Sequence, residues 1–282
     1  MVGKAIQRLG AAGVDQPRMD AWLLLAHLRS VDRATLLAHA RDPLDENDRL
    51  SFQALVDRRA AREPLAHIIG RREFWSLDLQ ITADVLCPRP DSECLVDAAL
   101  HEIRQSTKGH QREWNGRILD LGVGSGCLLL ALLSELPAAW GVGVDISQQA
   151  LSVARSNGEM LGLGKQVSWL CCDWGTSLEG RFDLIVSNPP YITDREASDL
   201  APEIRNFEPA TALFAGEDGL DAYRALRSDL ERLLAPRGRI CLEIGHGQAV
   251  AVEALFLQAG VRSIRRQQDL AGVDRCLVLT RD

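Results

Sequence analysis

The chain has 282 residues, of which 46% are hydrophobic and 25% are charged, and its formal net charge is −7 at pH 7. These values are typical of a globular protein with one large domain or two smaller ones. The acidic balance argues against a protein held on nucleic acid by its own charge, so no stable nucleic-acid binding is expected.

Residues 1–72 are predicted to form a small helical bundle. Segments with helical patterns and Gly or Pro breaks between them lie at residues 5–13, 19–28, 32–40 and 45–62. None of these segments alternates apolar and polar residues as a strand would. We therefore expect a separate N-terminal helical domain.

Residues 73–90 follow a different pattern. Phe74, Leu77 and Leu79 suggest short extended segments with a turn between them, and a Pro-rich stretch closes the region. This pattern predicts a hairpin-like connector between two domains.

From residue 91 to residue 282, apolar strand-like runs alternate with helical runs. Strands are expected at 117–122, 141–146, 166–173, 182–188, 239–245 and 276–280. Helices are expected between most of them, at 127–136, 148–162, 220–234 and 248–260. Such a pattern predicts an α/β domain with a mostly parallel sheet covered on both faces, which binds its ligand at the carboxyl ends of the strands.

The seven cysteines form no C-x-x-C pair, and the six histidines have no spacing suited to zinc. We expect reduced thiols, a cytoplasmic location and no metal site. The residues at 1–13 lack the apolar core of a secretory signal, and the apolar stretch 21–28 is too short to span a bilayer. No membrane association is expected. A monomer is expected because no apolar surface stripe stands out.

The loop "GVGSG" follows the first strand of the α/β region. Its glycines, Gly122, Gly124 and Gly126, let the backbone approach a ligand closely. The loop lacks the Lys of a P-loop, and Cys127 stands where a dinucleotide fingerprint needs Gly. Asp120, just before the loop, suits a cation better than a pyrophosphate. A plain tight turn between strand and helix is the alternative interpretation.

Acidic and aromatic residues follow the next two strands. Asp145 is placed to accept hydrogen bonds from both ribose hydroxyls, and Asp173 from an exocyclic amine. Trp174 offers a flat face for an adenine ring. Each has a structural alternative, as a helix cap, a loop residue or core filling. Together with the glycine loop they describe an adenosine that carries a positive charge instead of phosphates.

S-adenosylmethionine fits this description. Residues 91–282 resemble a class I S-adenosylmethionine-dependent methyltransferase, which implies a Rossmann-like fold with a mostly parallel seven-stranded sheet and S-adenosylhomocysteine as the product.

The motif "NPPY" closes the fourth expected strand. The Asn188 side-chain oxygen and the Pro189 carbonyl can each accept one N–H of a planar NH₂ group. Pro189 and Pro190 fix the backbone in advance, and Tyr191 can stack on the flat substrate group. A rigid loop after a buried strand is the alternative. An NH₂ of this kind occurs in adenine and in the glutamine side chain.

Three further stretches, "PLAHIIGRREFWSLDL", "CPRPDSECLV" and "FEPATALFAGEDGL", decide between these substrates. With "NPPY" they make nearly the whole chain similar to the release factor glutamine methyltransferase family (PrmC/HemK). The resemblance implies methylation of the glutamine in the Gly-Gly-Gln motif of peptide chain release factors. The implied cofactor-binding residues are Gly122, Val123, Gly124, Ser125, Gly126, Asp145, Asp173, Trp174 and Asn188. The implied substrate-binding residues are Asn188, Pro189, Pro190 and Tyr191, and Asn188, Pro189 and Tyr191 are the catalytic candidates.

Several interpretations stay open at this level. Val123 stands where many relatives have Thr, and the stretch "EIGHGQ" receives no role beyond strand and turn. Asp91 or Ser92 is expected to cap a helix rather than contact a ligand. The loop 192–217 is expected to act either as a lid over the acceptor or as disordered surface. The helices of 1–72 are expected to dock the protein substrate. An adenine methyltransferase for DNA or RNA and a catalytically silent binding module are the other functions considered.

Overall fold

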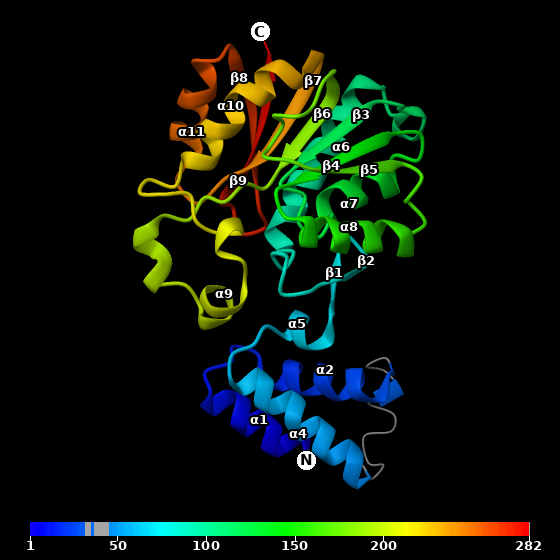
Figure 1. Ribbon diagram of the computed structural model, residues 1–282, viewed down its shortest axis with the longest axis vertical. Helices are drawn as coiled ribbons and strands as arrows, with labels where there is room; N and C mark the ends of the chain where they lie inside the picture. Colours follow the sequence, from blue (N-terminus) through cyan, green and yellow to red (C-terminus); the bar gives the residue numbers. More distant parts are fainter. Residues whose placement is uncertain (32–34, 37–44, 282) are drawn as a thin grey trace. The chain divides into compact units, whose positions relative to one another are not determined.

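The computed structural model describes residues 1–31, 35–36 and 45–281 (Figure 1). The helix predicted at 32–40 therefore lies, apart from positions 35 and 36, outside the described residues. The chain forms two compact units. One comprises Met1–Arg71 with Leu200–Phe207, and the other comprises Arg72–Asp199 with Glu208–Asp282.

The first unit is helical. Its helices are α1 (Val2–Ala11), α2 (Pro17–Arg29), α4 (Glu46–Ala60), α5 (Leu65–Ile69) and α9 (Pro202–Phe207). The Asp45 side chain caps α4 by accepting a hydrogen bond from Asp48 N at 2.8 Å. Leu9, Leu24 and Phe52 are at most 1% exposed and lie at the centre of a core shared by α1, α2 and α4.

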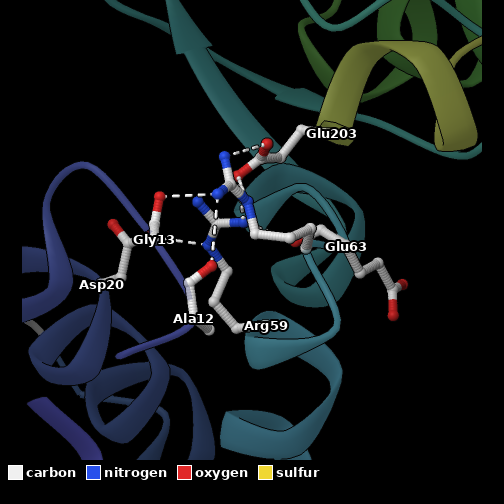
Figure 2. A network of polar contacts seen from close by, with 7 residues as sticks. Ala12, Gly13, Asp20, Arg59, Glu63 and Glu203 are labelled. Atoms are coloured by element: carbon white, nitrogen blue, oxygen red, sulfur yellow. Dashed lines mark hydrogen bonds and ion pairs between the residues drawn. The ribbon is translucent and has the colours of Figure 1, made fainter. Parts of the chain in front are cut away.

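Nothing in the sequence signals that α9 joins this unit, because it lies far along the chain between two elements of the sheet domain. Buried and half-buried charges hold it there (Figure 2). Arg59 is 7% exposed and donates to Asp20 at 2.7 Å and to Glu203 at 2.9 Å. Arg62 donates to both oxygens of Glu203 and to the backbone carbonyl of Gly13. Every partner in this cluster is a charged group or a backbone carbonyl, as buried guanidinium groups require.

A two-stranded hairpin, β1 (Arg71–Phe74) and β2 (Leu77–Gln80), follows the helices. Its two-residue turn has positive φ angles at Trp75 (51°) and Ser76 (59°), as a type I′ turn requires. Neither residue is a glycine, so the turn is strained. Two carboxylates hold it in place, because Trp75 donates through its backbone N–H to Glu93 and through its indole N–H to Glu135.

The second unit is built on a seven-stranded sheet. Its strands are β3 (Arg117–Leu121), β4 (Trp140–Asp145), β5 (Val167–Cys171), β6 (Phe182–Ser187), β7 (Leu234–Glu243), β8 (Val261–Gln268) and β9 (Asp274–Arg281). The spatial order is β5-β4-β3-β6-β7-β9-β8. Neighbours from β5 to β7 are parallel, and β9 runs antiparallel to both β7 and β8. The predicted α/β class with a mostly parallel sheet is confirmed.

Five longer helices cover the sheet. They are α6 (Glu93–Ser106), α7 (Cys127–Glu135), α8 (Gln148–Met160), α10 (Asp221–Leu233) and α11 (Ala249–Leu257). Figure 1 shows α6, α7 and α8 on one side of the sheet and α10 and α11 on the other. Short 3₁₀ turns occur at Pro90–Ser92, Gln111–Glu113, Asp194–Ser198 and Ala210–Ala212. In the described part of the chain, no helix is long and apolar enough to cross a membrane.

The register places three strand ends side by side. Asp120 of β3 lies opposite Gly143 of β4 and opposite Val186 of β6. From β3 the chain first adds β4 and β5 on one side and then β6 and β7 on the other. Open α/β sheets bind ligands at the point where the strand order reverses in this way. The loops that follow these three strands therefore meet at one edge.

The long loop after β6 is closed at its base. Ile192 forms a bridge with Phe214, and its backbone N–H donates to Leu213 O at 3.0 Å. Thr193 and Glu196 form a reciprocal capping box at the start of the first 3₁₀ turn. The structure therefore gives this loop ordered local structure rather than the disordered surface considered from the sequence.

Candidate active site

A cavity of about 290 Å³ opens at the carboxyl edge of the sheet, close to the lower end of the range for small-molecule sites. Of the predicted site residues, those that line it are Gly122, Val123, Gly124, Ser125, Asp145, Asp173, Trp174, Asn188 and Pro190. Gly126, Pro189 and Tyr191 are not among the lining residues. The strand ends therefore bring most of the candidate residues to one cavity.

Asp145 holds the glycine loop in shape. One carboxylate oxygen accepts from Gly124 N and the other from Ser147 N, both at 2.9 Å. The backbone N–H groups of Gly122 and Val123 both donate to Val144 O. Asp145 lines the cavity while making these two bonds, and each of its oxygens can accept a further hydrogen bond.

Two of the glycines are needed for different reasons. Gly122 has φ +78°, a left-handed conformation that favours glycine, and a Cβ there would meet the Trp174 ring only at an ordinary contact distance of 3.4 Å. Gly126 has φ +84° and is the N-cap of α7; a Cβ there would lie 3.0 Å from Leu130 and 3.3 Å from Ala154. Gly126 therefore serves the packing of α7 against α8.

Asn157 links the loop to the hairpin, a role that no sequence motif announces. Its side chain is fully buried and donates to Ser125 O at 2.9 Å. The same side chain exchanges hydrogen bonds with both backbone polar groups of Gln80. The hairpin thus stabilises the wall of the cavity.

Asp120 differs from the expectation of an acid beside a cation. It is 1% exposed, is not among the lining residues, and neither carboxylate oxygen has a hydrogen-bond partner within normal distance in the described structure. Burial raises the pKa of its carboxyl to about 8. Asp120 is therefore a buried group beneath the loop.

The chain turns sharply out of the sheet at Asn188. This residue lines the cavity, and its side-chain nitrogen donates to Ser92 Oγ at 3.3 Å. Ser92 is 2% exposed and occupies the N-cap position of α6, yet its side chain makes no capping hydrogen bond. Ser92 therefore contacts the motif in addition to marking the start of the helix, which the sequence favoured as its sole role.

Tyr191 is held at two points, its side-chain hydroxyl and its backbone carbonyl. Its hydroxyl donates to Glu243 Oε1 at 3.4 Å, and burial raises the pKa of the phenol to about 12. Gln248 donates to Tyr191 O at 3.0 Å and accepts from Gly245 N. The stretch "EIGHGQ" thus supports the motif, although no role was assigned to it from sequence. Stacking of Tyr191 on a substrate stays a prediction.

Two further walls of the cavity come from segments for which the sequence named no site residue, although a lid role for the loop 192–217 and a ligand contact for Asp91 or Ser92 were among the interpretations considered. One is contributed by the segment before α6 and the other by the return of the long loop; these lining residues are Asp84, Val85, Leu86, Pro88, Arg89, Ser92, Pro209, Thr211 and Ala212. Arg89 donates to Glu208 at 2.6 Å and so joins the two walls. The Glu208 side chain is 1% exposed, and burial raises the pKa of its carboxyl, with Arg89 opposing this rise.

No group of three or more His, Cys, Asp or Glu side chains suited to a metal ion is found among the described residues. All seven cysteines are free thiols.

The sheet order, the glycine loop after β3, the acid after β4 and the Asn-Pro-Pro-Tyr turn after β6 define a class I methyltransferase. Two family models match, the PrmC N-terminal domain at residues 1–70 and the methyltransferase small domain at residues 106–211.

Curated relatives extend the match over nearly the whole chain. A release factor glutamine methyltransferase of Rhodospirillum rubrum is 41% identical over 100% of this chain and 84% of its own length. That of Caulobacter vibrioides is 44% identical over 97% of this chain and 93% of its own length. The chain belongs to the release factor glutamine methyltransferase family.

Solved structures share the fold. The catalytic domain of hMettl16 bound to an RNA hairpin has a TM-score of 0.56 at 16% identity, covering 80% of this chain and 81% of that one. The 16S rRNA methyltransferase RsmC of T. thermophilus, solved with AdoMet and guanosine, has a TM-score of 0.51 at 18% identity, covering 75% of this chain and 50% of that one. At these identities the likeness concerns the fold alone.

Proposed function

We propose that this enzyme transfers a methyl group from S-adenosylmethionine to the side-chain amide nitrogen of the glutamine in the Gly-Gly-Gln motif of peptide chain release factors. The position of Asn188 carries the proposal, because this amide lines the same cavity as the glycine loop. The relatives named for this activity, at 41% and 44% identity, support the choice of substrate.

The cavity residues fit the cofactor. Gly122 and Gly124 have positive φ and expose backbone to the cavity, Asp145 can accept from ribose hydroxyls, and Trp174 lies against the loop. Asp173 is exposed and free to accept from an amine. When bound, the cofactor supplies an electrophilic methyl carbon on a positively charged sulfur. The acidic groups around the cavity suit that charge.

The chain's own contribution is to bind and orient the amide. Asn188 Oδ1 and the Pro189 carbonyl are the two acceptors for the substrate NH₂, and the two prolines hold them in fixed geometry before substrate arrives. Positioning of this kind can supply effective molarities of about 10⁵ M or more. No strong base is needed beforehand, because the methylated nitrogen is acidic and loses its proton readily.

The N-terminal helices are proposed to dock the release factor. The match of residues 1–70 to the PrmC N-terminal domain supports a conserved module at this place. The 192–217 loop, whose residues Pro209, Thr211 and Ala212 line the cavity, is proposed to contact the acceptor peptide.

The test is methyl transfer from isotope-labelled S-adenosylmethionine to a purified release factor, with mass spectrometry of the peptide that carries the Gly-Gly-Gln motif. We expect one methyl group on the glutamine. A release factor with Gln replaced by Glu in the motif is the control and should take no label. Label on adenine in parallel DNA or RNA samples, with none on the release factor, would overturn the proposal in favour of a nucleic-acid methyltransferase.

A further inference from the structure

We propose that Glu243, the last residue of β7, is a positioning residue for methyl transfer: through Ser92 and Tyr191 it fixes the Asn188 amide with its oxygen toward the cavity. This inference rests on the proposed function and gives a role to Glu243 and Ser92, which that function leaves without one. Glu243 touches neither substrate nor cofactor in this scheme and acts through its two neighbours.

The contacts form a short chain. Asn188 Nδ2 donates to Ser92 Oγ at 3.3 Å, and Tyr191 OH donates to Glu243 Oε1 at 3.4 Å. The Ser92 hydroxyl also faces the Glu243 carboxyl, and its hydrogen bonding to the carboxylate opposes the rise in the pKa of that group that burial causes. Glu243 therefore lies behind both ends of the Asn-Pro-Pro-Tyr turn, at the end of the strand that pairs with β6.

Glu243 determines which group donates and which accepts in the hydrogen bond between Ser92 and Asn188. A serine hydroxyl has one proton to donate and can accept through its oxygen, whereas an ionised carboxylate only accepts. When Ser92 donates to Glu243, its oxygen is left to accept, and only the nitrogen of the Asn188 amide can donate to it. The Asn188 oxygen is then free for a substrate N–H. Without the Glu243 carboxylate as an acceptor, Ser92 can instead donate to the Asn188 oxygen. The Asn188 NH₂ group, which cannot accept a substrate N–H, would then face the cavity.

The fold itself does not call for a carboxylate here. Glu243 is 2% exposed, and its Oε2 has no hydrogen-bond partner within normal distance in the described structure. The place of the strand is already secured by backbone pairing of Leu242 with Leu277 and of Glu243 with Cys276. Burying a carboxylate with so few hydrogen-bond partners is unfavourable. A group retained at such a cost next to the catalytic turn points to a role in the reaction.

Ionisation of Glu243 can be followed because burial raises the pKa of its carboxyl to about 7. The other titratable or charged groups that face it are Tyr191, Tyr223, Cys94, Cys127, Cys276, Asp91 and Arg275. The pKa values of Tyr191, Cys94 and Cys127 are raised to about 12, chiefly by burial, and those of Tyr223 and Cys276 are also raised. These five groups stay protonated between pH 6 and 9.

Three variants test the proposal in the full-length enzyme: Glu243→Gln, Ser92→Ala and the double variant. Each single variant should lower kcat for release factor about 10- to 100-fold, as misplacement of a reacting group does, while cofactor affinity stays within a factor of about 2. The double variant should lose no more than the worse single variant, because both changes break the same chain. Glu102→Gln, at a half-buried carboxylate paired with Arg239 and Arg265, is the matched control and should keep full kcat.

A second measurement needs no turnover. In ¹⁵N-labelled wild-type enzyme, the side-chain NH₂ signal of Asn188 should shift with a midpoint near pH 7, and Glu243→Gln should abolish this shift. An unchanged titration in Glu243→Gln, full kcat in that variant, or multiplicative losses in the double variant would each overturn the proposal. If wild-type enzyme methylates no release factor, the proposed function fails, and the Asn188 titration still decides whether Glu243 controls the amide.

Discussion

Arg62 donates to both carboxylate oxygens of Glu203, from Nε at 2.7 Å and from Nη2 at 2.6 Å. This bidentate ion pair connects α9 to the N-terminal helices, and Arg59 donates a third hydrogen bond to the same carboxylate. The α9 segment, which follows the Asn-Pro-Pro-Tyr turn along the chain, is therefore held by residues of the helical unit. Deleting residues 1–72 would remove these partners as well as any docking surface, so point variants separate the two effects better.

Glu203→Gln should destabilise the enzyme by about 2 kcal/mol. The Glu203 side chain is 16% exposed, so its loss leaves two guanidinium groups poorly compensated, at a cost between that of exposed and fully buried pairs. Chemical denaturation and limited proteolysis within residues 195–207 provide the measurement. The control is Glu217→Gln, whose partner Arg195 is 80% exposed, and it should change stability by less than about 0.5 kcal/mol. Equal effects of the two variants would contradict the anchoring role.

Asn188→Ala should reduce kcat about 10²- to 10³-fold, the usual cost of removing one preorganised hydrogen-bonding group at a reacting centre. Cofactor affinity should change by less than about 3-fold, since the glycine loop and Asp145 are untouched. Single-turnover kinetics and calorimetric titration with cofactor measure the two quantities. Turnover equal to wild type would rule out the amide clamp, whichever residue orients it.

Asp145→Asn should weaken cofactor binding about 10- to 100-fold. Asn keeps one acceptor oxygen, so its NH₂ group must replace the acceptor of either Gly124 N or Ser147 N. The loss of one hydrogen bond to a charged group costs about 1.5–3 kcal/mol. Asp173→Asn is the comparison for folding stability. Because Asp173 is exposed, its replacement should leave the free energy of unfolding within about 0.5 kcal/mol of wild type. Unaltered cofactor affinity in Asp145→Asn would contradict the assignment.

Stability should fall as pH rises between about 4 and 8, partly because of Asp120. Burial raises the pKa of this carboxyl from 3.8 to about 8 in the folded protein, so the unfolded chain releases the proton first. The contribution is fully present below the unfolded value and is lost as pH approaches the folded one, with a slope of up to about 1.4 kcal/mol per pH unit. Asp120→Asn should flatten this slope in denaturation series at several pH values. A slope identical to that of wild type would show that Asp120 is already ionised in the folded enzyme.

Much of the sheet could be predicted because its central strands are short apolar runs, and β3, β4 and β6 lie close to the expected ranges. β8 was missed as a strand because it is an edge strand with alternating exposure and the polar sequence VRSIRRQQ. The seventh strand was implied only by family resemblance. β7 begins at Leu234, earlier than predicted, because Pro236 and Gly238 look like a turn in sequence.

The site was predicted where one short motif holds several of its residues. The glycine loop and Asn188 could be recognised in the sequence because the backbone conformations there require Gly and Pro at fixed positions. Ser92, Asn157 and Glu243 carry no such signature, and their contacts with the motif depend on chain segments that meet only after folding. Spacing in sequence contains no information about such partners.

The bridge between Ile192 and Phe214 sets a boundary just beyond Tyr191. Backbone hydrogen bonds at this neck fix where the excursion begins and ends, so its outer part pays little more than a logarithmic entropy penalty for added residues. Changes at the mostly exposed residues 194–199, which precede Glu203 and the cavity-lining residues Pro209, Thr211 and Ala212, can thus accumulate without moving the Asn-Pro-Pro-Tyr turn. These positions are therefore where evolution or protein engineering can alter the surface while the neck keeps its backbone pairing.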